Sequence, residues 1–140
     1  MRLLWAGAAL LAASQAFAQP PLPFDVGGPF DLVDQHGQSR SERDPKGHAQ
    51  LLFFGYANCL SICSAALPLM ADVVDALADE GIALTPVMIT VAPEQDRVET
   101  MGAPLADIHA DFVGLTGDQA ALQGAYDAYS VEIEPLFQDP

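Results

Sequence analysis

The sequence predicts an α/β domain in which helices cover a parallel β-sheet. Three apolar runs are typical of strands and lie at residues 50–56, 83–91 and 112–115. Each run precedes a segment whose apolar residues have helical spacing, at residues 64–80, 96–108 and 119–129. Because strands that alternate with helices return to the sheet in parallel, this order predicts a parallel sheet.

A short hairpin is expected before the first of these strands. Apolar residues alternate with acids from Phe30 onward, and His36-Gly37 occupies the place of a turn. Residues 39–47 are charged and rich in turn-forming residues, which predicts a surface loop. The strand at 50–56 is expected to be central, because its unbroken apolarity indicates burial on both faces.

The first helix has sequence signals at both ends. Ser64 is expected to be its N-cap. Pro68 must lie near its start, because proline lacks the N–H that a later helical position would donate. Gly81 is expected to end it.

Proline and glycine also limit the later elements. Pro86 should place the start of its strand toward an edge or a bulge. Gly102 and Pro104 interrupt the second helical pattern, so we expect a kink or a later start. Residues 116–118 form a turn that caps the third helix.

Residues 1–18 have the pattern of a secretory signal peptide. Arg2 precedes an apolar segment, and Ala16-Phe17-Ala18 supplies a small-residue cleavage site. The apolar segment is shorter than the roughly 20 residues of a membrane-spanning helix. We therefore expect cleavage, export to the periplasm and no membrane span in the remaining chain. Residues 19–26 are then an extended, Pro-rich lead, and residues 27–140 form one domain.

Acidic residues dominate the composition. The chain has 19 Asp and Glu against five Lys and Arg, a formal net charge of −14 that becomes −15 when Arg2 is removed with the leader. Phosphate groups repel such a surface, which argues against nucleic acid as a partner. The sequence also lacks P-loop, GxGxxG, GxSxG and HExxH motifs, so the cysteines are the main candidates for chemistry.

The chain has two cysteines, Cys59 and Cys63, between the first strand and the first helix. The N-terminus of a helix favours negative charge and therefore favours thiolate over thiol. Three interpretations are open: a structural disulfide, which export favours, a redox-active dithiol, and a site for a soft metal such as Cu(I). A crosslink across so short a loop adds little entropic stabilisation, which weakens the first interpretation.

The sequence resembles the Sco/SenC family in four successive blocks: GGPFDLVDQHG, LLFFGYANCLSIC, ITVAPEQD, and FVGLTG with the helix ending at AYDAYSV. The resemblance covers about residues 27–131 and is most specific in FGYxxCxxxC. It implies a thioredoxin-like αβα sandwich with an N-terminal β-hairpin. It also implies a copper protein that helps to metallate the binuclear copper centre of cytochrome c oxidase subunit II. The family binds copper through two cysteines and a downstream histidine, so the resemblance makes Cys59 and Cys63 metal ligands and a redox-active dithiol.

The family pattern is incomplete in this chain. The ligand histidine, the final strands and the last helix would fall beyond Pro140, so we expect a fold that lacks them. Leu60 and Ser64 stand where proline usually follows each cysteine, and Ala92 stands where aspartate is usual.

None of the three histidines of the chain is a convincing replacement for the missing ligand. His36 fits the hairpin turn, His48 precedes the first strand at the end away from the cysteines, and His109 lies at a helix-to-strand junction. Met70 and Met88 lie on core-facing patterns and are expected to be packing residues.

We therefore expect a copper chaperone for cytochrome c oxidase assembly that holds Cu(I) through Cys59 and Cys63. Binding of Cu(II) should be poor, because Cu(II) prefers nitrogen or oxygen donors. The expected partners are cytochrome c oxidase subunit II or another copper protein, and a protein that reduces thiols. The alternatives are a metal-free periplasmic thiol-disulfide oxidoreductase and an inactive fragment with an uncovered sheet edge.

Overall fold

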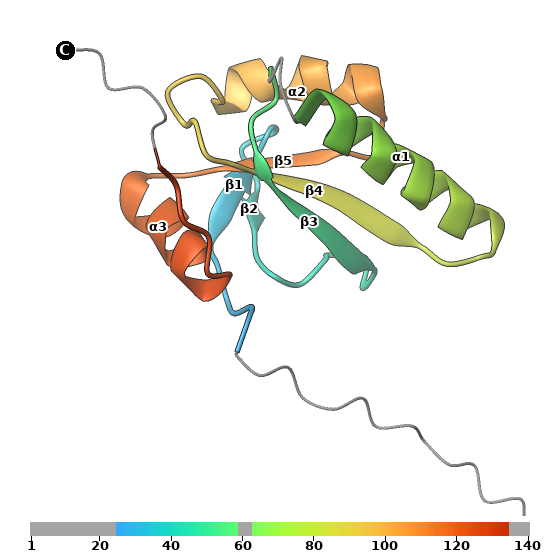
Figure 1. Cartoon of the computed structure of the whole chain (residues 1–140), viewed down its shortest axis with the longest axis horizontal. Helices are drawn as coiled ribbons and strands as arrows, with labels where there is room; N and C mark the ends of the chain where they lie inside the picture. Colours follow the sequence, from blue (N-terminus) through green and yellow to red (C-terminus); the bar gives the residue numbers. More distant parts are fainter. Residues whose placement is uncertain (1–24, 59–62, 135–140) are drawn as a thin grey trace, which may run out of the picture.

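The computed structural model describes residues 25–58 and 63–134 as five strands and three helices (Figure 1). The strands are β1 (Leu32–Asp34), β2 (Ser39–Arg40), β3 (Ala49–Gly55), β4 (Leu84–Thr90) and β5 (Val113–Thr116). The helices are α1 (Cys63–Asp79), α2 (Val98–Ile108) and α3 (Gln119–Ala128). None of these three helices is long and apolar enough to cross a membrane.

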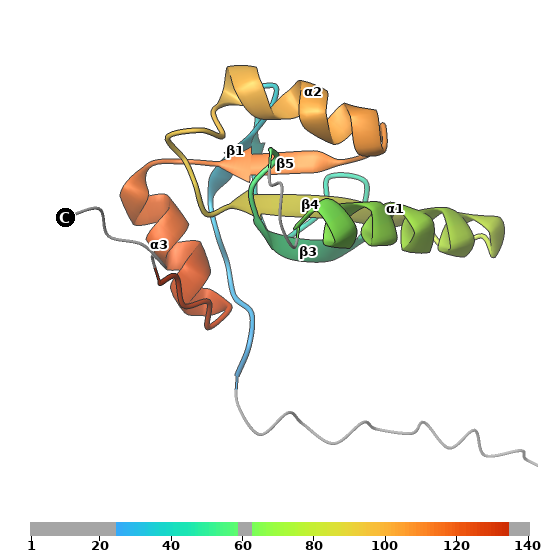
Figure 2. The same cartoon turned by 45° about the horizontal axis from the view of Figure 1, so that its top comes forward.

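The strands form one sheet in the order β2-β1-β5-β4-β3. β3, β4 and β5 are parallel, and β1 is antiparallel to both β2 and β5. Figures 1 and 2 show α1 and α2 on one face of the sheet and α3 on the other. The predicted αβα sandwich with an N-terminal hairpin is confirmed. Because the three parallel strands end at one edge, the helices that follow them also begin there.

Two apolar clusters hold the helices on the sheet. The cluster under α1 and α2 contains Met70, Met88 and Leu105, and the cluster under α3 contains Ile89 and Leu122. Met88 and Ile89 are neighbours on β4 and serve opposite clusters, as the period of two in a strand requires. Met70 and Met88 are buried packing residues, as predicted.

The structure corrects the predicted position of the first long strand. We expected β3 in the centre of the sheet, but in the part of the chain that the structure describes it is the last strand and pairs only with β4. Leu51 and Phe53 contact the α1–α2 cluster, and Leu52 and Phe54 contact the α3 cluster, so the apolar run does serve both faces. All four side chains are only half-buried, because no described strand covers the outer edge.

α1 begins at Cys63, one residue before the predicted cap, and continues through Pro68. Pro68 lies close enough to the start that its missing N–H removes only an early helical hydrogen bond. Gly81 has a φ of +80° and donates its N–H to the carbonyl of Ala78 at 2.9 Å. The predicted stop at this glycine is confirmed, since a left-handed residue commonly ends a helix.

α2 begins at Val98, upstream of Gly102 and Pro104, and runs without a break through both residues. The expected interruption is therefore wrong. Met101 and Leu105, on the face that packs on the sheet, are fully buried. Burial of this face outweighs the low helix propensity of glycine and proline.

Pro86 lies inside β4, where it pairs with Leu51 of β3. β5 begins only beside Val87, so this end of β4 has a neighbour on one side alone. The expected edge or bulge is thus a section of β4 that has a neighbouring strand on one side alone, where a missing N–H is tolerated.

The β1–β2 hairpin is built on a buried carboxyl. Asp34 is fully buried and accepts the N–H groups of His36 at 2.8 Å and Gln38 at 3.0 Å, and Nε–H of Arg40 at 2.7 Å. Burial alone would raise the pKa of Asp34, but the hydrogen bonds from Gln38, Arg40 and His36 favour the carboxylate and lower its pKa overall. Gly37, with a φ of +73°, completes the predicted turn.

Candidate functional site

The two cysteines follow the carboxyl end of β3, as the sequence predicts. Cys59 lies outside the described residues, and Cys63 is the first residue of α1, with a side chain that is likewise not described. The described framework consists of the turn at residues 56–58 and the 17-residue helix α1.

A buried carboxyl anchors the turn that precedes Cys59. Asp96 is 0% exposed, and its Oδ2 accepts the N–H of Ala57 and the hydroxyl of Thr90, both at 2.9 Å. Ala57 is two residues before Cys59. A single carboxylate oxygen therefore joins the turn that follows β3 to the last residue of β4.

Further hydrogen bonds connect this anchor to α3 and to β3. The Tyr126 hydroxyl donates to the carbonyl of Thr90 at 2.6 Å, and the N–H of Val91 donates to the carbonyl of Gly55 at 2.8 Å. Burial, and to a lesser extent the Glu94 carboxylate, raises the pKa of Tyr126. Its hydroxyl therefore keeps its proton at neutral pH and remains a donor.

The three histidines lie at the end of the sheet opposite to the carboxyl ends of β3, β4 and β5. His48 directly precedes β3 and His109 precedes β5, so both lie at the amino ends of parallel strands. His36 is in the turn after β1, and the antiparallel pairing of β1 with β5 brings this turn to the same end. The side chain of the adjacent Gln35 accepts the N–H of Gly114 at 3.0 Å, which fixes the turn beside the start of β5.

His109 has both ring nitrogens engaged. Its Nε2 lies 3.1 Å from Oδ1 of Asp75, and its Nδ1 accepts the N–H of Asp111 at 3.1 Å. Among the described side chains, no group of three or more His, Cys, Asp or Glu could hold a metal ion.

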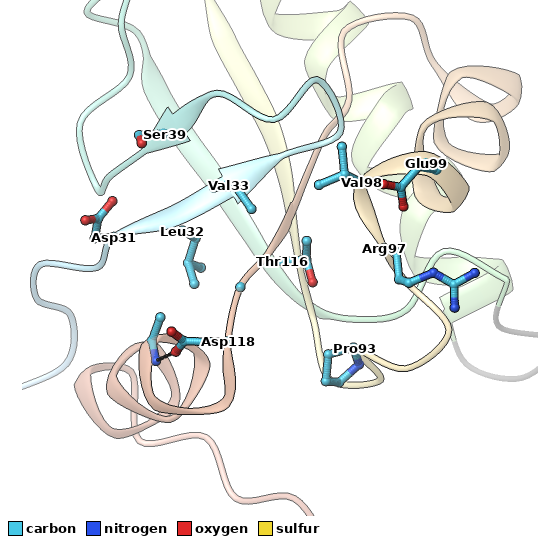
Figure 3. A pocket seen from close by; sticks show the side chains of 12 residues that line it. Asp31, Leu32, Val33, Ser39, Pro93, Arg97, Val98, Glu99, Thr116 and Asp118 are labelled. Atoms are coloured by element: carbon cyan, nitrogen blue, oxygen red, sulfur yellow. Dashed lines mark hydrogen bonds between the residues drawn. The ribbon is translucent and has the colours of Figure 1, made fainter.

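A pocket of about 550 Å³ lies beside β1, at the starts of α2 and α3 (Figure 3). Its lining includes Thr116 at the end of β5, Arg97 and Asp118 at the two helix N-termini, and the acidic Asp31 and Glu99. The lining contains no cysteine or histidine, so this pocket supplies no soft metal ligand.

Asp96 and Thr90 were not predicted as site residues from the sequence. Both belong to the ITVAPEQD block, which carried the family resemblance without a role for either residue. The available signal was a polar residue at the end of an apolar strand, followed by an acid in the next turn, at the edge where the cysteines were expected. Parallel strands bring such residues to one edge of the sheet.

Comparisons with known proteins agree with this fold. A family model described as SCO1/SenC matches residues 18–139. The SCO2-like protein of Rickettsia felis is 34% identical over 106 residues, which cover 76% of this chain and 52% of that protein. Yeast Sco1, solved with copper bound, is similar with a TM-score of 0.70 at 31% identity, over 81% of this chain and 70% of that chain.

A further solved relative is BsSco, described as a member of the Sco family of cytochrome c oxidase assembly proteins with a disulfide switch. It is similar with a TM-score of 0.59 at 26% identity, over 84% of this chain and 70% of that chain. The chain spans about half the length of the first curated relatives that it matches. With a family model matching nearly all of its length and a fold shared with copper-bound Sco1, the chain belongs to the SCO1/SenC family.

Proposed function

We propose that this protein is a copper chaperone that binds Cu(I) through Cys59 and Cys63 and assists the assembly of cytochrome c oxidase. The observation that carries the proposal is the position of the only two cysteines of the chain. They lie at the β3–α1 turn of a SCO1/SenC fold, and the related yeast Sco1 has been solved with copper bound. Copper is here the cargo of the protein.

The donors of this chain suit Cu(I) better than Cu(II). Two thiolates are soft ligands and can hold Cu(I) with a low coordination number, whereas Cu(II) prefers nitrogen and oxygen donors in a tetragonal arrangement. The three histidines lie at the far end of the sheet. We therefore propose that the chain carries copper in the reduced state.

The same two cysteines also form a redox-active pair in this proposal. Copper binding requires the dithiol, so the disulfide must first be reduced by a partner protein that exchanges thiols. The disulfide switch of BsSco supports this part of the proposal. The recipient would be cytochrome c oxidase subunit II or another copper protein, and the leader at residues 1–18 supports a periplasmic location.

The rival function is thiol-disulfide exchange without copper. It is favoured by the start of α1 at Cys63, since a helix N-terminus activates thiols in oxidoreductases as well as in metal sites. The two functions differ in whether reduced protein retains copper, because an oxidoreductase needs only the sulfur chemistry.

Anaerobic reconstitution separates the two functions. The full chain, reduced, mixed with excess Cu(I) and passed over a desalting column, should retain about one copper per chain. The disulfide form should retain none, because it offers no thiolate. A reduced chain that retains no copper but still exchanges disulfides with glutathione would be an oxidoreductase, and the chaperone proposal would be wrong.

A further inference from the structure

We propose that Asp96 is the positioning residue of the thiol pair. It fixes the turn before Cys59 and thereby sets the equilibrium between the dithiol and the disulfide. The inference rests on the proposed function, in which Cys59 and Cys63 are the reactive pair.

The anchor is buried and joins distant parts of the chain. Asp96 and Ala57 are 39 positions apart, and their hydrogen bond lies in the interior. The Thr90 hydroxyl that binds the same oxygen is itself held, because it accepts the N–H of Ala92 at 3.0 Å. The carbonyl of Thr90 is held by the Tyr126 hydroxyl. The acceptor for Ala57 thus has a position determined by β4 and α3.

The second oxygen of Asp96 indicates a role other than stability. Oδ1 is buried and has no hydrogen-bond partner among the described residues. Among the described residues no donor compensates Oδ1 for its lost hydration, and an uncompensated buried oxygen destabilises a fold. Asp96 has this unpaired oxygen and also holds the turn that precedes Cys59. This combination fits a functional site better than a structural contact.

Anchoring the turn should favour the disulfide. When the dithiol reacts with glutathione disulfide, the S–S bond of glutathione breaks and one forms between Cys59 and Cys63. The two thiol protons pass to two molecules of glutathione. The equilibrium constant measures the effective concentration of one protein thiol at the other. Ala57 is two residues before Cys59, so a fixed Ala57 restricts where Cys59 can lie relative to the start of α1.

The test is the glutathione redox equilibrium of three full-length chains: wild type, Asp96→Ala and Asp96→Asn. Asp96→Ala removes the acceptor and should lower the equilibrium constant for disulfide formation about tenfold, or about 30 mV for this two-electron couple. Asp96→Asn keeps an acceptor oxygen of the same shape for Ala57 and Thr90. It should therefore stay within about twofold of the wild type.

Asp34→Asn is the matched control. Asp34 is the other fully buried aspartate, but it lies in the hairpin at the opposite end of the sheet. Its replacement should lower stability and leave the redox equilibrium unchanged. If Asp34→Asn and Asp96→Ala shift the redox equilibrium equally, the shift comes from a general loss of stability. That result would overturn the inference. An equal shift in Asp96→Asn and Asp96→Ala would assign the effect to charge and also overturn it.

Thr90→Val gives a second test if Asp96→Ala does not fold. This substitution keeps the shape of the side chain. It removes the hydroxyl that donates to Oδ2 of Asp96 and accepts the N–H of Ala92. We expect a smaller shift in the same direction, and no shift would overturn the inference. A wild-type chain that forms no internal disulfide would overturn the proposed function as well. A wild type that forms it, with Asp96→Ala unchanged, would overturn this inference alone.

Hydrogen exchange at the Ala57 amide tests the anchor without any reaction of the cysteines. The amide should exchange slowly in the wild type, in Asp96→Asn and in Asp34→Asn. It should exchange at least about tenfold faster in Asp96→Ala, because the carboxylate oxygen that accepts this N–H is lost. Equal exchange rates in Asp96→Ala and the wild type would contradict the positioning role.

Discussion

A Cys63→Ser chain should lose stable Cu(I) binding, and a Cys59→Ser chain should lose it equally. Each substitution leaves one thiolate, whereas the proposed site needs two. The loss of affinity should exceed the roughly 10–100-fold that follows removal of a residue that only supports a ligand. Anaerobic competition with a chromophoric Cu(I) chelator measures it.

Single substitutions of the histidines are the matched controls. His36→Ala, His48→Ala and His109→Ala should each keep the Cu(I) affinity of the wild type, because these residues lie at the amino ends of the parallel strands. A Cys63→Ser chain that still competes with the chelator, or a histidine variant as weak as the cysteine variants, would exclude the two-thiolate site.

Gly114→Ala should destabilise the fold by about 1–3 kcal/mol. A Cβ at this position in β5 would lie 2.6 Å from Cδ1 of Leu105 and 3.0 Å from Sδ of Met101. Both side chains are fully buried under α2, so neither can move away without disturbing the core. Urea unfolding followed by circular dichroism measures the change, with the slope of the transition as a check on two-state behaviour.

Gly124→Ala serves as the control for this prediction. A Cβ at Gly124 meets no atom within 4 Å, and the residue lies inside α3, where alanine is the better helix former. This variant should gain about 0.5–1 kcal/mol. Equal unfolding midpoints for the two variants would contradict the close packing of α2 on β5. A single cooperative transition in the wild type would also argue against the inactive-fragment alternative.

Local sequence signals predicted the order and type of the elements. Apolar runs located the three long strands, and Gly81, Gly37 and the N-cap Asp118 marked ends and turns that the structure contains. Asp118 accepts the N–H of Ala121 at 2.8 Å, as a helix N-cap should. These features depend on the few residues around each position, so the sequence alone was sufficient.

Features set by distant contacts were harder to predict. The apolarity of β3 indicated contacts on both faces but did not reveal whether a neighbouring strand lay on each side. Gly102 and Pro104 argued against a continuous α2, yet burial of Met101 and Leu105 holds the helix together. Propensity is a weak signal when tertiary packing opposes it.

The candidate site also contains residues that the sequence could reveal and a residue that it could not. Cys59 and Cys63 could be found because they are the only cysteines and lie at a strand-to-helix turn. Asp96 could not be found by spacing, because its partner Ala57 is 39 residues away and the hydrogen bond exists only once β3 and β4 pair. The residues proposed to carry the chemistry were visible in the sequence, whereas the residue proposed to position them could be identified only from the fold.

We expect two thiolates to hold Cu(I) in this chain without help from its three histidines. Parallel titrations of the reduced full chain with Cu(I) and with Cu(II), the latter followed by electron paramagnetic resonance, measure this preference. The reduced chain should bind about one Cu(I) tightly and should have no tight Cu(II) site. A tight Cu(II) complex whose spectrum shows coordination by histidine nitrogen would contradict it.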